Sequence, residues 1–127
     1  YFTANAPQKT ILVGDLNIAP REDDVWDHKK LLKVVSHTPI EVEALAEVQA
    51  AGGWIDVTRA NIPDGQLYSW WSYRSPDWDG ADKGRRLDHV WATPDIAGSA
   101  HSSRVIRDVR GWEQPSDHAP VFATFDV

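Results

Sequence analysis

The chain has 127 residues and a formal net charge of −6, from 13 lysines and arginines against 19 aspartates and glutamates. Its length fits one domain, and its 42% hydrophobic and 25% charged residues are typical of a globular protein rather than a disordered one. No stretch approaches the roughly 18 uninterrupted apolar residues of a membrane helix. Cysteine is absent, which excludes disulfides and thiolate metal sites. Because the chain starts at Tyr1 and contains no methionine, we expect it to be part of a longer protein.

Short strands and one well-marked helix are expected along the chain. A β-branched apolar run predicts a buried strand over residues 10–14. Thr38, Pro39 and Glu41 have the spacing of a capping box, so a helix begins there, and glycines 52–53 end it. Further strands are expected over 66–74, 86–92, 103–109 and 119–125. Five strands and one helix predict an α+β domain dominated by sheet.

Three polar clusters are expected at the ends of these strands, where loops present side chains on a rigid scaffold. Asp15 and Asn17 follow the first strand two residues apart, so strand alternation places them on one side. Asp88 lies in an otherwise apolar strand, where a carboxylate needs a partner or a metal. Residues 116–118 (Ser-Asp-His) precede the last strand, and a buried pair with His118 would favour a protonated imidazole.

Each cluster also has a purely structural interpretation, and the residues alone leave both open. Residues 14–17 could form a turn closed by an Asx hydrogen bond, and residues 116–118 a turn before an edge strand. Asp88 could anchor a nearby backbone amide. The carboxylate and amide oxygens of the clusters would suit a hard cation such as Mg²⁺ or Mn²⁺. The basic run over 83–86 would most often be a solvated face.

Taken in order, the clusters resemble the exonuclease–endonuclease–phosphatase superfamily. The resemblance runs from Thr10 to Phe125 and is carried by four segments: Gly-Asp-Leu-Asn at 14–17, Tyr-Ser-Trp-Trp-Ser-Tyr-Arg at 68–74, Gly-Arg-Arg-Leu-Asp at 84–88 and Ser-Asp-His-Ala-Pro-Val at 116–121. The first and last segments indicate only the superfamily. The two middle segments favour the exodeoxyribonuclease III branch of abasic-site DNA repair nucleases.

The resemblance implies roles for individual residues. The catalytic set would be Asp15, Asn17, Asp88 and His118, with Asp88 orienting His118. The metal, Mg²⁺ or Mn²⁺, would be held by Asp15, Asn17 and Asp117. DNA would be contacted by Trp70, Arg85, Arg86 and Leu87, with Trp70 and Leu87 at the abasic sugar and the arginines on phosphates. The implied reaction is hydrolysis of phosphodiesters in double-stranded DNA at an abasic site or 3′ end.

The resemblance also implies a fold in which this chain is incomplete. Members of the family form a four-layer α/β sandwich, and residues 1–127 match its C-terminal half. The N-terminal half supplies a glutamate, an asparagine and a tyrosine of the active site that have no counterpart here. We therefore expect a half-sandwich of mostly antiparallel sheet with flanking helices and several tryptophans exposed on its inner face. Such a chain would be inactive alone, would need its N-terminal half as partner, and would belong to the bacterial cytoplasm.

Two other functions are compatible with the sequence. The chain could belong to another branch of the superfamily, acting on a phosphoinositide, sphingomyelin or RNA, although Trp70, Trp71 and the Arg85-Arg86 pair disfavour that branch. It could also be a non-catalytic module that pairs with a partner chain, or with itself, through its exposed sheet.

Overall fold

The computed structural model of the protein describes residues 1–126. The strands are β1 (Ile11–Asp15), β2 (Ile55–Asp56), β3 (Asp88–Ala92), β4 (Ala100–Val105) and β5 (Val121–Phe125). The α-helices are α1 (His28–Leu31), α2 (Pro39–Gly52), α3 (Val57–Asn61), α4 (Trp78–Ala81) and α5 (Pro94–Ala97), with 3-10 helices η1 (Glu22–Asp24) and η2 (Arg107–Gly111). Among the described residues, no helix combines the length and apolar character needed to cross a membrane.

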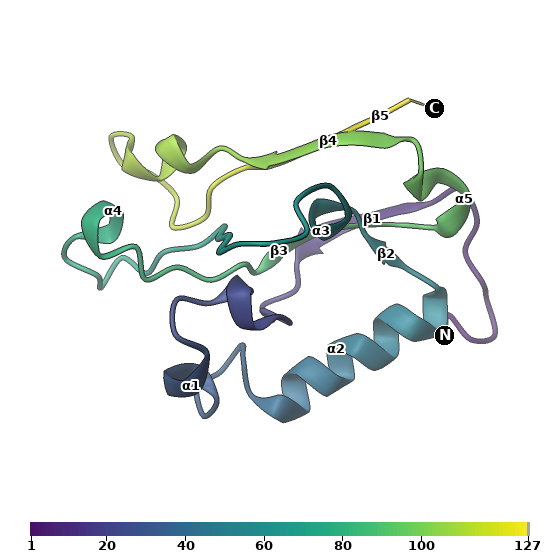
Figure 1. Ribbon diagram of the computed structural model, residues 1–127, viewed down its shortest axis with the longest axis horizontal. Helices are drawn as coiled ribbons and strands as arrows, with labels where there is room; N and C mark the ends of the chain where they lie inside the picture. Colours follow the sequence, from purple (N-terminus) through teal and green to yellow (C-terminus); the bar gives the residue numbers. More distant parts are fainter. Residues whose placement is uncertain (127) are drawn as a thin grey trace.

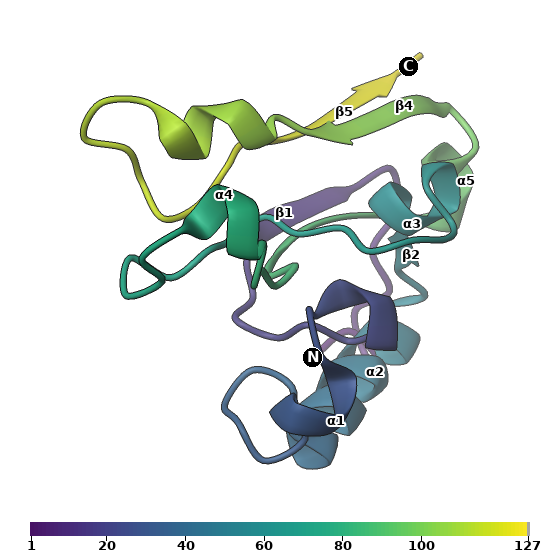
Figure 2. The same ribbon diagram turned by 60° about the vertical axis from the view of Figure 1, so that its left-hand side comes forward.

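The strands form two antiparallel sheets, a three-stranded sheet in the order β1-β3-β2 and the β4-β5 hairpin. The hairpin lies over one face of the three-stranded sheet and α2 lies on the opposite side (Figures 1 and 2). In the β1–β3 pair, Ile11 stands opposite Ala92 and Asp15 opposite Asp88. Antiparallel pairing thus brings the end of one strand to the start of the other and sets two carboxylates side by side.

Helix α2 begins and ends as its sequence indicates. The hydroxyl of Thr38 accepts a hydrogen bond from the Glu41 amide, and the Glu41 carboxylate accepts one from the Thr38 amide, which completes the capping box. Gly53 follows in the left-handed conformation, at φ 66°, which glycine adopts without strain. The helix buries Leu45 against Trp54 and Trp91. The α+β class and the predicted helix are therefore confirmed.

Two of the expected strands differ in the structure. Residues 66–74 form no strand, because only Trp70 pairs, in isolated bridges to Arg85 and His118. The backbone amide of Trp71 donates to the Asp117 carbonyl instead. The segment therefore bonds first to the residues around Arg85 and then to those around Asp117, and it runs alongside neither for long enough to form a strand. The strand expected over 103–109 lies earlier, as β4, because η2 takes up residues 107–111.

Three of the seven tryptophans are buried rather than exposed as expected, and Trp112 is the most exposed of the others, at 65%. Trp54, Trp71 and Trp91 are at most 4% exposed, because α2 and the loops around the sheet pack over them. The most exposed apolar side chain of the three-stranded sheet is Val13 of β1, at 66%, and Ile11 of β1 and Ile55 of β2 are 41% and 38% exposed. Since β1 is also an edge strand, its unpaired backbone edge and its apolar side chains are both exposed.

A buried network of charges joins the first third of the chain to β3. The guanidinium of Arg86 and the carboxylate of Asp24 are both fully buried, with Arg86 Nε 2.7 Å from Asp24 Oδ1. Asp24 also pairs with Arg59 at 2.6 Å, and Arg86 with Asp56 at 2.8 Å. Burial would raise the pKa of Asp24, but the hydrogen bonds and charges of the two arginines outweigh it and lower the pKa.

We expect Arg86→Ala to lower the free energy of unfolding by about 3–5 kcal/mol, because it leaves the Asp24 carboxylate buried without its main partner. Urea denaturation measures this change. Arg21→Ala is a matched control, since the Arg21–Asp23 pair is 41% and 28% exposed and its loss should cost under about 1 kcal/mol. Equal losses of unfolding free energy in the two variants would show that the buried ion pair contributes no more to stability than the exposed one.

Candidate active site

Asp15 is presented by the turn that ends β1. Its Oδ1 accepts a hydrogen bond from the Asn17 amide at 3.0 Å, and Asn17 adopts the left-handed conformation at φ 56°. This segment therefore forms an Asx turn. The turn uses only Oδ1 of Asp15, and Oδ2 remains available to other groups. Asn17 is exposed, and its side chain makes no hydrogen bond to another side chain within residues 1–126.

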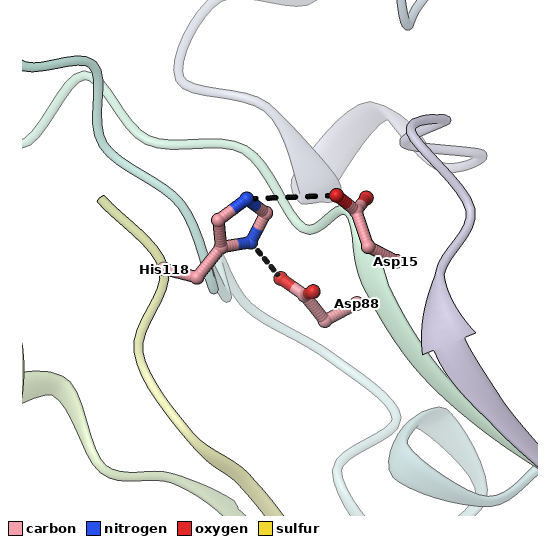
Figure 3. Close-up of side chains that lie close together, drawn as sticks. All are labelled: Asp15, Asp88 and His118. Carbon is pink, nitrogen blue, oxygen red and sulfur yellow. Dashed lines mark hydrogen bonds and ion pairs between the residues drawn. The ribbon is translucent and has the colours of Figure 1, made fainter. Parts of the chain in front are cut away.

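His118 lies between the carboxylates at the ends of β1 and β3 (Figure 3). Its Nδ1 is 2.7 Å from Oδ2 of Asp88, and its Nε2 is 3.5 Å from Oδ2 of Asp15. The Asp117 carboxylate is farther away, at 3.9 Å from Nε2. Nδ1 of the imidazole is thus tightly bonded to Asp88. Nε2 is held more loosely and faces Asp15 and Asp117. The predicted Asp88–His118 pair is present.

The surroundings of His118 favour its protonated form. Partial burial lowers its pKa, but the hydrogen bond and charge of Asp88, with the charges of Asp15 and Asp117, outweigh burial, so the net pKa is raised above the usual value of histidine. A protonated imidazole bonded to Asp88 through Nδ1 has an N–H at Nε2 to give to an anion.

Ser69 is a member of this site that the sequence did not indicate. Its hydroxyl donates to Oδ2 of Asp88 at 2.7 Å and accepts from the amides of Leu87 and Asp88 at 3.0 and 3.1 Å. Ser69, rather than Asp88, therefore anchors the nearby backbone amides. A serine among tryptophans and tyrosines carries no distinguishing signal in the sequence.

A compact group of potential metal ligands is formed by Asp15, Asp88 and His118, whose ligand atoms lie within 4.8 Å of one another. Of the two aspartates in the predicted metal set, Asp15 belongs to this group and Asp117 does not. Asp117 stands at the edge, because its Oδ2 accepts from Nε1 of Trp70 at 3.0 Å. With both His118 nitrogens facing carboxylates, the carboxylate oxygens are the atoms suited to a hard divalent cation.

A groove of about 700 Å³ has Asp117 in its lining. It is lined by three aromatic side chains and three cations, namely Trp26, Trp70, Tyr73, Arg74, Lys83 and Arg85. The Arg85 guanidinium stacks over Trp70 at 5.1 Å and donates to the Val35 carbonyl and the Ser36 hydroxyl. Burial lowers the pKa of Arg85, and no carboxylate lies within 4.0 Å of it among residues 1–126.

Two of the predicted DNA contacts lie below the surface. Arg86 is fully buried on Asp24 and Asp56, so the prediction that it contacts a phosphate is wrong for this structure. Leu87 is 5% exposed and belongs to a core cluster on which Trp70 packs, so it supports the groove from beneath and does not line it. Both arginines precede β3, where Arg85 makes an isolated bridge to Trp70 and stacks on its ring, whereas Asp24 and Asp56 bind the Arg86 guanidinium in the interior.

The fold and this site define a phosphoesterase-like α+β domain, and comparison with known proteins agrees. The chain belongs to the Endonuclease/Exonuclease/phosphatase family, whose sequence model matches residues 2–118. It is similar to exodeoxyribonuclease III of Haemophilus influenzae (29% identical, over 91% of this chain) and to an exodeoxyribonuclease of Bacillus subtilis (34% identical, over 87%).

Solved structures agree with the fold. An AP endonuclease from Archaeoglobus fulgidus matches 100% of this chain and 50% of its own length, with a TM-score of 0.92 at 30% identity. A 3′ phosphatase from Neisseria, determined with a product DNA hairpin, matches 92% of this chain and 45% of its own, with a TM-score of 0.86 at 33% identity. The chain likewise spans only 45% and 42% of the two curated relatives. It therefore has the fold of part of these proteins.

The raised pKa of His118 predicts a pH-dependent contribution to stability. A group whose pKa is higher in the folded state stabilises the fold fully below its unfolded value, about 6.5 for histidine, and loses this contribution as pH rises through the folded value. We expect the stability difference between wild type and His118→Gln to be largest in acid and to shrink towards alkaline pH. Denaturation at several pH values measures it. His101→Gln, at a 52% exposed imidazole, is the control. A difference that grows with pH would contradict the assignment.

Proposed function

We propose that this chain is the C-terminal portion of a divalent-metal-dependent DNA repair nuclease that hydrolyses phosphodiesters at abasic sites or 3′ ends. The observation that carries the proposal is the His118–Asp88 pair, whose loosely held Nε2 faces Asp15 beside an aromatic and cationic groove. The similarity to exodeoxyribonuclease III and to an AP endonuclease supports this choice within the family. The bacterial relatives support the bacterial cytoplasm as the place of action.

The residues suggest a division of labour during hydrolysis. Protonated His118, held by Asp88, donates from Nε2 to a phosphate oxygen and stabilises the negative charge that develops when water attacks phosphorus. Asp15, 3.5 Å from that nitrogen, is placed to accept a proton from the water or return one to the leaving oxygen. Asn17, two residues on, would hold the phosphate and the water.

A divalent cation fits the acidic side of this site. We assign its binding to Asp15 with Asn17 and Asp117, whose oxygens match the hard-ligand preference of Mg²⁺ or Mn²⁺, and Asp88 also lies in the compact ligand group. When bound, the cation supplies Lewis-acid neutralisation of the phosphate charge. A substrate phosphate thus meets a cation on the Asp15 side and an imidazolium on the other.

The groove is suited to DNA rather than to an apolar ligand. The Arg85 guanidinium is partly buried and donates only to neutral oxygens among the described residues. A phosphate of the DNA backbone would supply the negative charge that these oxygens lack. Lys83 lies 4.9 Å over the Trp26 ring and adds a second cation to the lining of the groove. Trp70, at the Asp117 end, is placed to pack against a sugar that lacks its base.

Activity is expected to require the N-terminal half of the domain. The open edge and exposed Ile11 and Val13 of β1 provide a surface for it. A hollow of about 350 Å³ lined by Val13, Asp15 and Asp88 also lies beside the catalytic group, so the missing half would border the site directly. The chain alone would then be inactive.

We expect this chain to cleave abasic duplex DNA with Mg²⁺ only when it is mixed with the part of the Archaeoglobus fulgidus enzyme that it does not cover. In the active mixture, His118→Ala should lower turnover by at least about 100-fold, because it removes the charge-stabilising donor. Gel-based cleavage kinetics measure both effects. Unchanged turnover in His118→Ala would remove this residue from the mechanism, and His101→Ala controls for loss of an exposed histidine.

We further expect Trp70→Ala to weaken cleavage at an abasic site more than removal of nucleotides from a 3′ end, because only the abasic sugar is expected to pack on the indole. The two rates, measured on matched duplexes, give the ratio. Trp70→Phe retains an aromatic ring but loses the Nε1 bond to Asp117, and so separates packing from hydrogen bonding. Equal losses on both substrates would show that Trp70 serves only the core.

Two alternatives are distinguished by the same mixtures. Faster turnover of an RNA, phosphoinositide or sphingomyelin substrate than of abasic DNA would favour another branch of the family. The second alternative is a non-catalytic module that pairs with another chain, and the exposed apolar edge of β1 is the observation that favours it. Light scattering that finds a monomer with no tendency to associate would exclude pairing with itself.

A further inference from the structure

We propose that Ser69 is a positioning residue, which fixes the Asp88 carboxylate so that Oδ2 points at Nδ1 of His118. Its consequence for catalysis rests on the proposed function, whereas its effect on the geometry of the Asp88–His118 pair does not. Ser69 lies outside every set of site residues indicated by the sequence, and it is buried and does not line the groove beside Asp117, so its role is to act through Asp88.

The hydroxyl of Ser69 has a single possible orientation. A serine hydroxyl carries one hydrogen and two acceptor lone pairs. The amides of Leu87 and Asp88 donate to the oxygen at 3.0 and 3.1 Å and occupy both lone pairs, which leaves the hydrogen for Oδ2 of Asp88 at 2.7 Å. Because Ser69 is 0% exposed, water does not compete for any of these bonds.

The backbone of Ser69 is held at the same junction. Its amide donates to the Arg85 carbonyl at 3.0 Å, and its carbonyl accepts from the Ala119 amide at 2.7 Å. Arg85 precedes Asp88 by three residues, and Ala119 directly follows His118. Ser69 therefore lies between the segment that carries the carboxylate and the segment that carries the imidazole, and its position fixes the spacing of the pair.

Asp88 needs such a restraint because rotation of a carboxylate about its last torsion is broad and weakly hindered. Among residues 1–126, the side-chain hydrogen bonds to Asp88 come from Ser69 and His118, and both end on Oδ2. Without the hydroxyl, His118 alone would hold the carboxylate.

The nuclear magnetic resonance signal of the His118 Nδ1 proton tests the proposal in this chain at one fixed pH. In the wild type we expect a low-field signal, typical of a proton in a short bond to a carboxylate. In Ser69→Ala it should move upfield and broaden, and in Ser69→Thr, which keeps the hydroxyl, it should return. Ser103→Ala is the control, since Ser103 lies in β4 and bonds to Asn61. A folded Ser69→Ala variant with an unchanged signal would overturn the proposal.

A second measurement needs no variant and covers the case in which Ser69→Ala does not fold. The hydroxyl proton of Ser69 and the Nδ1 proton of His118 bond to the same oxygen, so they lie close together. We expect a slowly exchanging hydroxyl signal with a cross-peak to the Nδ1 proton in the wild type. Absence of that cross-peak would overturn the proposal.

Neither measurement requires DNA, metal or the N-terminal half, so the geometric role of Ser69 stands or falls separately from the nuclease activity. In the complemented enzyme, Ser69→Ala should lower kcat by about 10-fold, the size expected for one lost hydrogen bond to a charged group, with little change in KM. A variant that alters the Nδ1 signal but not kcat would keep the positioning role and argue against His118 in the proposed reaction.

Discussion

Arg86 is a cation with no contact with water, and the segments around it are arranged to neutralise it. Asp24 comes from η1 and Asp56 from β2, while Arg59 from α3 shares Asp24. Three segments distant in sequence, namely η1, the continuous β2–α3 segment and the residues before β3, thus meet at one buried network, because an unpaired buried guanidinium would be very costly. Arg86 also stands two residues before Asp88, so the network that satisfies the charge fixes the start of β3, and with it the carboxylate that holds His118.

The side chains of Asp15, Asp88 and His118 come from three segments of the chain, and backbone hydrogen bonds hold these segments in place. The β1–β3 register sets Asp15 beside Asp88. The amide of Trp71 donates to the Asp117 carbonyl and the amide of Ala119 to the Ser69 carbonyl, which places His118 over the same pair. Each acid then has a different environment. Asp88 is 21% exposed and bonded through Oδ2 to both Ser69 and His118, whereas Asp15 is 38% exposed and lies 3.5 Å from His118. The two carboxylates that flank His118 therefore differ in burial.

Local signals in the sequence predicted local features well. The capping box of α2 and the strand ends carrying Asp15 and Asp88 follow from residue types within a few positions of one another. The sequence failed where the outcome depends on distant partners. Arg85 and Arg86 are identical neighbours, yet one lines the groove and the other is buried, because Asp24 and Asp56 accept only the second. Ser69 and the irregular course of 66–74 are likewise decided by Arg85, Asp117 and Ala119, which lie 16 to 50 residues away.

The open edge of β1 gives Asp15 a significance that is separate from its place beside His118. In the strand Ile-Leu-Val-Gly-Asp it is the one charged residue, at an edge whose neighbours Ile11 and Val13 are exposed and apolar. A charge at such an edge opposes the stacking of one copy of a strand on another. Substituting Asp15 by a neutral residue would therefore remove a charge that opposes aggregation, together with the carboxylate to which we assign a catalytic role. Loss of activity in such a variant has to be judged against the fraction of protein that stays dispersed.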